Sequence, residues 1–450
     1  MSTALSVAII GAGPSGFYTA EHLLKQDLPI EIDLIDRLPT PYGLVRGGVA
    51  PDHQKIKSVT RVYDKIAAHP AVRFLGHVRI GTDLTRAELL THYHAVVYAF
   101  GAQSDRALGI PGEDLPGSHA ATEFVGWYNG HPDYREQRFD LGAPGVAVIG
   151  MGNVAVDVVR ILARTPDELA ATDIAGEALE ALRSSAVRDI YMIGRRGPAQ
   201  GAFTNPELKE LGEMPDADID VRPEELEGES GGDKAVEKNL ETLRRFATKP
   251  RRGRRRTIYL RFLRSPLALE GVGRVERIVL GKNRLVQDGE GSLQARPTGE
   301  SETLPVGLVF RSVGYLGTGI PGVPLDARRG IIPNVEGRVL NAPGQVAPGE
   351  FTVGWIKRGP SGVIGTNKPD AVESADLLLE DHAAGRLNPA PYPGRAAVDT
   401  TLAARGVRVV SWADWLRLDA LERTRGKAAG RPRLKFTRID SMLAALDGIS

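Results

Sequence analysis

The sequence predicts an α/β fold made of two parallel-sheet units, with the second unit inserted into the first. Two observations predict this fold. Short apolar runs at residues 6–10 and 146–149 each end in a glycine-rich turn, and a helical pattern of apolar residues follows each turn. A near-continuous apolar run is typical of a parallel strand that is covered on both faces. Strands that alternate with helices in this way indicate doubly wound sheets.

The first glycine-rich turn spans residues 11–16, with the sequence GAGPSG. In a strand–turn–helix unit, Gly11 permits the tight turn, Gly13 lets a pyrophosphate approach the backbone, and Gly16 lets helix and strand pack closely. The helix that follows, near residues 15–25, directs its free N–H groups at the phosphates. A second strand at residues 30–35 ends at Asp36, where an acid can accept hydrogen bonds from both ribose hydroxyls of an adenosine. Together these features predict a Rossmann-like dinucleotide-binding domain; the alternative is a structural turn with an ordinary surface Asp.

The second glycine-rich turn spans residues 150–155, with the sequence GMGNVA. The strand after its helix, at residues 190–193, ends not in an acid but in Arg195 and Arg196. Arginine offers planar, permanently charged donors that grip phosphate oxygens, so this unit is expected to prefer NADP(H) to NAD(H). The acid in one unit and the arginines in the other predict two different cofactors, FAD and NADP(H). The alternative for the arginines is that they only solvate a loop.

Composition sets limits on the class of protein. A chain of 450 residues with 42% hydrophobic and 25% charged residues is typical of a globular protein with two or three domains. The net charge of +1 implies no general attraction to nucleic acid or to a membrane. No apolar stretch approaches the ~18 residues that a membrane span needs. Because the first strand begins near residue 6, we expect no signal peptide and a cytoplasmic location.

The sequence contains no cysteine. This excludes disulfide reduction through a CxxC pair and an iron–sulfur cluster held by thiolates of this chain. We also expect no metal site. If a flavin takes electrons from NADPH here, the electrons must leave to an acceptor outside the chain.

Two glycine- and proline-rich passages, near residues 109–112 and 310–324, divide the chain. They predict an FAD-binding domain formed by residues 1–105 and 316–450, and an NADP-binding domain formed by residues 106–315. Residues 214–234 are acidic and glycine-rich, with weak periodicity, and are expected to form a surface loop.

Further motifs extend over nearly the whole chain, from about residue 5 to residue 440. They are PYGLVR (41–46), GVAPDH (48–53), FVGWYNG (124–130), GRRGP (194–198), AFT (202–204), GWIKRGP (354–360) and GVI (362–364). Together these motifs closely resemble the adrenodoxin-reductase-type ferredoxin–NADP reductases. In that family the ribose acid is usually Glu, whereas this chain has Asp36.

The resemblance implies FAD in the first domain and NADPH in the inserted domain. It implies that a hydride passes from the nicotinamide to flavin N5, and that electrons then leave singly to an iron–sulfur protein. The residues that it places at FAD are Gly11, Gly13, Ser15, Gly16, Asp36, Leu44, Ile80, Trp355, Gly362, Val363 and Ile364. Those that it places at NADP(H) are Met151, Gly152, Asn153, Val154, Arg195, Arg196 and Glu207.

His53 and Glu210 resemble the family's polar pair near the nicotinamide. We expect them to serve positioning and proton balance, because hydride transfer needs no protein acid. A hydrogen-bonded structural histidine is an equally good interpretation of His53. For Trp355 the alternative is a core aromatic, and for Glu207 a helix N-terminal acid favoured by the dipole.

A basic stretch stands out in this near-neutral chain. Ferredoxins are typically acidic, so such a stretch would steer a ferredoxin-like partner and make the rate depend on salt. The alternative is a solvated loop. The stretch consists of Lys238, Arg244, Arg245, Arg251, Arg252, Arg254, Arg255 and Arg256.

Two other functions fit part of the pattern. A flavin monooxygenase also uses two dinucleotide-binding domains, but no substrate motif accompanies them here. A non-enzymatic, nucleotide-bound interaction protein would lack flavin, and no basic face with interleaved aromatic residues supports binding of nucleic acid.

Overall fold

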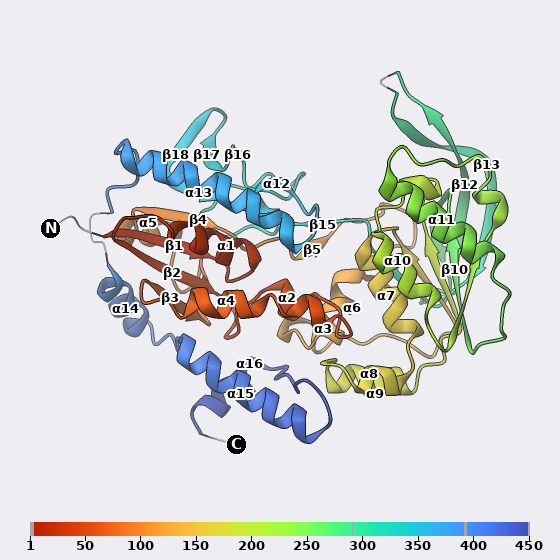
Figure 1. Cartoon of the computed structure of the whole chain (residues 1–450), viewed down its shortest axis with the longest axis horizontal. Helices are drawn as coiled ribbons and strands as arrows, with labels where there is room; N and C mark the ends of the chain where they lie inside the picture. Colours follow the sequence, from red (N-terminus) through yellow and green to blue (C-terminus); the bar gives the residue numbers. More distant parts are fainter. Residues whose placement is uncertain (1–3, 290, 391–393, 449–450) are drawn as a thin grey trace.

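The computed structural model describes residues 4–289, 291–390 and 394–448. Two lobes lie side by side, joined by a short connector of β5 (Ser104–Asp105) and β15 (Tyr315–Leu316), as Figure 1 shows. These two strands pair antiparallel, where the chain leaves the first lobe and returns to it. The predicted domain limits stay predictions, and their outer ends at residues 1 and 450 lie outside the described residues.

The first lobe is built on a seven-stranded sheet with the order β16-β17-β18-β4-β1-β2-β3. Strands β18, β4, β1, β2 and β3 are parallel, and β16 and β17 extend the sheet as an antiparallel edge. The glycine-rich turn after β1 therefore lies at the centre of the sheet. The strands are β1 (Leu5–Ile10), β2 (Ile30–Asp36), β3 (Val72–Gly76), β4 (Ala95–Tyr98), β16 (Asn334–Val335), β17 (Arg338–Ala342) and β18 (Gln345–Thr352).

Both faces of this sheet are buried, as the continuous apolar runs predict. Alternate residues of β1 belong to different cores: Val7 and Ile9 to one, Ala8 and Ile10 to the other. Helices from distant parts of the sequence cover these faces, so the lobe needs both ends of the chain. The helices of this lobe are α1 (Pro14–Leu23), α2 (Leu44–Gly47), α3 (Gln54–Lys57), α4 (Thr60–Ala67), α5 (Arg86–His92), α12 (Trp355–Arg358), α13 (Asn367–Ala383), α14 (Arg395–Ala404), α15 (Trp412–Ala428) and α16 (Ile439–Leu446).

The second lobe is built on a six-stranded parallel sheet with the order β6-β14-β7-β8-β10-β9. The strands are β6 (Ser118–Ala120), β7 (Gly145–Ile149), β8 (Asp189–Ile193), β9 (Ala217–Val221), β10 (Arg256–Arg261) and β14 (Leu308–Arg311). Its helices are α6 (Ala121–Tyr128), α7 (Asn153–Ala163), α8 (Pro166–Ala170), α9 (Gly176–Arg183), α10 (Asn205–Gly212) and α11 (Lys234–Thr248).

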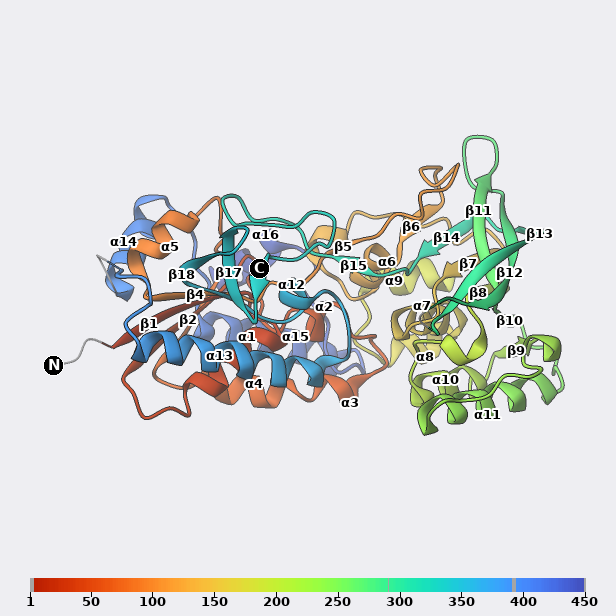
Figure 2. The same ribbon diagram turned by 90° about the horizontal axis from the view of Figure 1, so that it is seen from above.

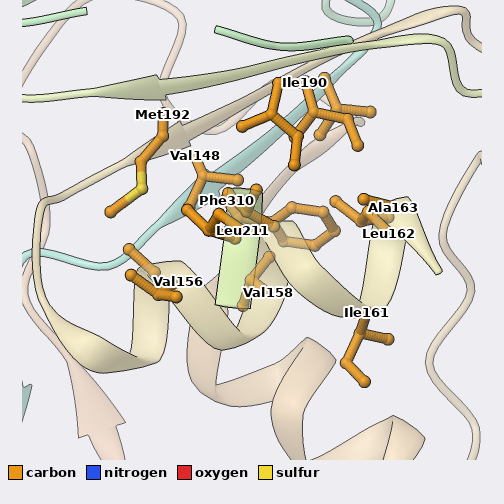
Figure 3. Close-up of a cluster of buried hydrophobic side chains, with 14 of the residues drawn as sticks. Val148, Val156, Val158, Ile161, Leu162, Ala163, Ile190, Met192, Leu211 and Phe310 are labelled. Carbon is orange, nitrogen blue, oxygen red and sulfur yellow. The ribbon is translucent and has the colours of Figure 1, made fainter. Parts of the chain in front are cut away.

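The core of this lobe lies where α7 packs on the sheet. Val156, Val158 and Leu162 of α7 meet Val148 of β7 and Met192 of β8, all of them buried, as Figure 3 shows. Because Val156 and Val158 lie on opposite sides of α7, this helix is buried on more than one face, between the sheet and neighbouring helices. The predicted α/β class, with one dinucleotide-binding unit inserted into another, is confirmed.

Two features of the second lobe differ from the sequence expectation. Within the segment expected to be a surface loop, residues 214–234, β9 forms the edge of the sheet. Its apolar residues Ile219 and Val221 are buried and alternate with acids, a period-two pattern that the acidic composition hides. A three-stranded antiparallel sheet of β11 (Arg264–Glu270), β12 (Arg277–Gln287) and β13 (Leu293–Pro305) also projects from this lobe, as Figure 2 shows.

None of the helices in the described ranges combines the length and the apolar content that a bilayer crossing requires.

Candidate cofactor sites

A cavity of about 1120 Å³ lies between the two lobes. Both glycine-rich turns contribute to its lining, and so do segments from the far end of the chain. Of the predicted cofactor-site residues, it is lined by Gly11, Gly13, Ser15, Asp36, Leu44, Ile80, Asn153, Val154, Glu207, Trp355, Gly362, Val363 and Ile364, together with His53. A cavity of this size is large enough for a dinucleotide.

The first turn needs glycine at two positions for steric reasons. Gly11 has a φ of +111°, and a Cβ there would lie 2.7 Å from the carbonyl oxygen of Ala99. A Cβ at Gly16 would lie 2.2 Å from the carbonyl oxygen of Gly11. Gly16 is buried behind the turn and does not line the cavity, so its contribution is to let α1 approach β1.

Asp36, at the end of β2, is fixed before any ligand arrives. One carboxylate oxygen accepts from the backbone N–H of Ala12 and the other from that of Leu38, both at 2.9 Å. Burial raises the pKa of Asp36, and the two N–H groups oppose this rise. Asp36 lines the cavity, and each of its oxygens can accept a further hydrogen bond, which suits two ribose hydroxyls.

The wall formed by residues 354–364 comes from the returning part of the chain. Trp355 begins α12, and its indole Nε1 donates to the carbonyl oxygen of Ser361 at 3.2 Å. Its ring lies 5.3 Å from that of Tyr315, at the connector. Trp355 is therefore not a core aromatic, because it lines the cavity with one end of its ring held by a backbone contact.

The second turn is joined to the loop before α10. Asn153 begins α7, and its side-chain oxygen accepts from the N–H of Thr204 at 2.8 Å. The N–H of Ala202 donates to the carbonyl oxygen of Met151 at 2.8 Å. Met151 and Gly152 lie outside the cavity lining, whereas Asn153 and Val154 contribute to it.

Arg195 and Arg196 line a separate pocket of about 360 Å³ beside the antiparallel sheet. Both are exposed, and in the part of the chain that the structure describes neither forms an ion pair. They follow the carboxyl end of β8, next to the second turn. Exposed guanidinium groups at this edge carry the charge and the donors that a phosphate group requires.

His53 and Glu210 are brought together from different lobes. The Nε2 atom of His53 lies 2.9 Å from Oε2 of Glu210 and 3.7 Å from Oε2 of Glu207. The side chain of Glu207 is less exposed than that of Glu210, and burial raises the pKa of Glu207. This contact links α3 of the first lobe to α10 of the second across the cavity.

The sequence did not indicate the centre of this cluster, which is Arg160. Its side chain is completely buried and ion-paired with Asp52 at 2.7 Å and Asp157 at 2.7 Å, and it lies 3.3 Å from both Glu207 and Glu210. These acids raise the pKa of Arg160 despite its burial, while the guanidinium holds the pKa of Asp52 far below its usual range. The sequence feature that could have indicated this role is an arginine placed among the apolar residues of α7.

The C-terminal segment also contacts both lobes. The Nζ atom of Lys435 donates to the carbonyl oxygens of Arg46 at 3.3 Å and Asn129 at 3.1 Å. It lies 3.5 Å from Asp173, which binds Lys57 at 2.7 Å. Burial lowers the pKa of Lys435, and the two lysines hold that of Asp173 at about 2. This network fixes the floor of the cavity near Arg46.

The basic stretch is less available than its composition suggests. Arg256 is 2% exposed and pairs with Asp216 at 3.0 Å, so it cannot contact a partner, which corrects that part of the expectation. Arg251 pairs with Asp220, Arg244 pairs with Glu237, and Arg255 donates to the carbonyl oxygen of Ser185. Lys238, Arg245 and Arg252 are exposed, and their side chains form no ion pair or hydrogen bond among the described residues.

Comparisons with known proteins identify the family. The chain is 48% identical to the NADPH-ferredoxin reductase FprA of Mycobacterium tuberculosis over 452 aligned positions, covering 97% of this chain and 98% of that protein. It is 43% identical to the mitochondrial NADPH:adrenodoxin oxidoreductase of Homo sapiens, covering 98% of this chain and 91% of that protein. The chain belongs to the adrenodoxin-reductase-type ferredoxin–NADP reductases. The predicted family and enzyme class are thus confirmed.

Solved structures of this family share the fold. M. tuberculosis FprA in complex with NADPH matches with a TM-score of 0.94 and 47% identity, over 99% of this chain and 100% of that one. A model of the pyridine nucleotide-disulphide oxidoreductase family matches residues 5–192. Because this chain has no cysteine, it shares the nucleotide-binding frame of that family without its disulfide chemistry.

FAD and NADP(H), the cofactors of this reductase family, fit the residues present. The first turn leaves room for a pyrophosphate, since a Cβ on Gly13 would have only one neighbour within 4 Å, at 3.8 Å. The carboxylate of Asp36, which two backbone N–H groups orient, fits the hydroxyls of an adenosine ribose. The exposed side chains of Arg195 and Arg196 fit a 2′-phosphate. The roles of individual residues stay predictions.

Proposed function

We propose that this protein transfers electrons from NADPH, through bound FAD, to a one-electron iron–sulfur acceptor of the ferredoxin type. The observation that carries the proposal is the cavity between the lobes. Both glycine-rich turns contribute to its lining. The strand after the first turn ends at Asp36, which lines the cavity, and the strand after the second turn is followed by Arg195 and Arg196, which line the adjoining pocket. Without cysteine, the chain has no disulfide and no thiolate-bound iron–sulfur cluster of its own to receive the electrons.

The first lobe is proposed to hold FAD. Gly13 and Ser15 face the pyrophosphate at the amino end of α1, and Asp36 binds the ribose. Leu44, Ile80 and Trp355 line the cavity and shield the flavin from water. Residues 362–364 offer backbone N–H groups before α13. When bound, FAD supplies the chemistry that couples a two-electron donor to a one-electron acceptor.

The second lobe is proposed to hold NADPH. The turn that contains Met151, Gly152, Asn153 and Val154 receives the pyrophosphate at the amino end of α7. Arg195 and Arg196 bind the 2′-phosphate in charge-assisted hydrogen bonds. Because Glu207 lies on the cavity wall, it can orient the nicotinamide half of the nucleotide.

His53 and Glu210 are proposed to position the nicotinamide end rather than to act as a required base. Their 2.9 Å contact spans the two lobes, and Arg160 fixes the carboxylate side of it. A proton shared between imidazole and carboxylate can balance charge as electrons arrive. The pair thus joins the two lobes beside the ion-paired Arg160.

Docking of the acceptor is proposed to use exposed cations of the basic stretch, with Lys238 and Arg245 on α11 as its centre. The backbone of Lys238 accepts a hydrogen bond from Asn205, at the start of α10, whose next turns carry Glu207 and Glu210. An acidic acceptor bound here would lie beside the cluster that contacts the cavity. Steering by these cations would make the rate depend on salt.

The decisive experiment compares acceptors. Purified holoprotein is expected to oxidise NADPH with ferricyanide and with a ferredoxin, and to prefer NADPH to NADH. Oxygen uptake coupled to hydroxylation of a small molecule, without ferredoxin reduction, would support a monooxygenase instead. Preparation of colourless protein that cannot oxidise NADPH would refute the proposal.

Two further assignments belong to this proposal. Residues 1–105 and 316–450 form the FAD domain and residues 106–315 the NADP domain; expression of residues 106–315 alone, followed by nucleotide binding, tests the limits. The cytoplasmic location is tested by cell fractionation.

A further inference from the structure

The loop after β8 is held in an unusual way by the antiparallel sheet. Residues 194–196 present three consecutive carbonyl oxygens to the junction of β10, β11 and β12, and each oxygen accepts one hydrogen bond. The donors are, in order, the backbone N–H of Arg264 at 2.9 Å, the side-chain Nδ2 of Asn283 at 2.9 Å and the backbone N–H of Leu263 at 3.1 Å. The middle donor is the only one of the three that a side-chain substitution can remove.

Asn283 is well placed for this task. It lies on β12, is 5% exposed, and gives a second hydrogen bond from Nδ2 to the hydroxyl of Ser265 at 2.8 Å. Its backbone N–H donates to the carbonyl oxygen of Leu263 at 2.8 Å, and Leu263 has a φ of +54°. The pairing of β12 with β13 shifts register between Gly281 and Asn283. Several bonds therefore fix the direction of the amide, rather than the hydrogen bond to Arg195 alone.

The main chain determines where the two guanidinium groups lie. In the described part of the chain, the side chains of Arg195 and Arg196 make neither an ion pair nor a hydrogen bond, so no polar contact orients them. Asn283 lines the same pocket of about 360 Å³ as both arginines. A change in the peptide of Arg195 would displace one guanidinium relative to the other, whereas phosphate recognition depends on their spacing.

We propose that Asn283 is a positioning residue for NADP(H) specificity: its amide holds the Arg195 peptide so that both arginines face one 2′-phosphate. This inference rests on the proposed role of the arginines. It places part of the cofactor discrimination in the antiparallel sheet, which contributes no glycine-rich turn and no phosphate-binding arginine.

The test measures binding as well as turnover. For Asn283→Ala in the holoprotein, the Kd of 2′,5′-ADP measured by calorimetry and the KM for NADPH are expected to rise about fivefold, the net value of roughly one hydrogen bond. The Kd of 5′-AMP, the KM for NADH and kcat with ferricyanide should stay unchanged. Asn283→Leu fills the same volume without a donor and should give the same result if the Ala variant folds poorly.

The matched control is Ser265→Ala, which removes the other partner of the same amide and leaves the Arg195 contact. It should leave the Kd of 2′,5′-ADP at the wild-type value. In an Arg195→Ala/Arg196→Ala background, Asn283→Ala should have no further effect. An equal effect in both backgrounds, or equal losses for 2′,5′-ADP and 5′-AMP, would overturn the inference.

The proposed role of the arginines can fail separately. If Arg195→Ala/Arg196→Ala weakens 2′,5′-ADP and 5′-AMP alike, the arginine assignment itself is wrong. If that variant weakens only 2′,5′-ADP while Asn283→Ala and Asn283→Leu change nothing, the arginine assignment stands and the role of Asn283 is refuted.

Discussion

Two groups of arginines occupy opposite ends of the same pair of strands, and their surroundings differ. Arg195 and Arg196 follow the carboxyl end of β8, whereas residues 251–256 precede or begin the neighbouring strand β10. The pairing of these two strands covers five residues, about 16 Å, and the two groups lie beyond its opposite ends. The first pair is exposed and has no ion pair within residues 4–289, 291–390 and 394–448. In the second group, Arg251 and Arg256 pair with acids of β9 and of the loop before it.

The number of charged residues in a segment therefore does not show whether their side chains are free to bind a ligand or a partner. Ligands of parallel sheets bind outside the carboxyl ends of the strands, so arginines there remain free for a phosphate. At the amino ends, Arg251 and Arg256 instead pair with acids of the edge strand and of the loop before it.

Removing the free pair should affect the coenzyme preference most. Arg195→Ala/Arg196→Ala is expected to raise the KM for NADPH about 100-fold, since each charged hydrogen bond contributes about 1.5–3 kcal/mol. The KM for NADH should change little in ferricyanide assays. The matched control, Arg252→Ala, is also an exposed arginine and should change neither constant. Equal losses for both coenzymes would contradict the comparison.

Removing a buried arginine should instead affect folding. Arg256→Ala is expected to lower the free energy of unfolding by roughly 2 kcal/mol, because it opens a space and leaves Asp216 without its partner. Denaturant titration measures this loss. Arg256→Met, which fills the space, should lose less, and the KM for NADPH should be normal in both variants. A rise in the KM for NADPH but not for NADH would show that residues 251–256 affect the site formed by Arg195 and Arg196.

The cations of α11 should affect only the protein acceptor. Lys238→Glu/Arg245→Glu is expected to lower kcat/KM for ferredoxin about tenfold at low salt, through lost steering. The effect should shrink as salt increases, and ferricyanide reduction should be unchanged. Arg252→Glu, an exposed change at the amino end of β10, provides the control and should have a smaller effect. A larger effect of Arg252→Glu would move the docking site to residues 251–256.

The two groups should also respond to acid at different pH. A phosphate monoester gains a proton near pH 6, so the KM for NADPH should rise several-fold from pH 7 to 5 while that for NADH does not. Near the other group, hydrogen bonds from the backbone N–H groups of Arg252 and Arg254 lower the pKa of Asp218. A lowered pKa gives stability that is present above about pH 4 and lost below it. Melting temperatures of the wild type and Asp218→Asn should therefore converge below pH 4. Parallel curves would show that Asp218 does not cause the pH dependence of stability.

Much of the fold and part of the site could be predicted from the sequence. The apolar runs before residues 11 and 150 are local signals, and β1 and β7 with their helices lie where those signals predict. Strand β9 was not predicted, because it lies in an acidic segment and only two of its residues, Ile219 and Val221, show the apolar alternation of a strand. The antiparallel sheet was missed because β13 is almost wholly exposed and has no apolar alternation.

The sequence by itself determined the two nucleotide-binding turns, the acid and the arginines after them, and the absence of thiol chemistry, since each depends on residue type and local spacing. Only the tertiary structure decided which charges are free. Arg160 meets Asp52 and Glu210, and Asn283 reaches the Arg195 peptide, through contacts between residues far apart in the chain. Such contacts depend on how sheets and lobes pack, and no local pattern in a single chain encodes that packing.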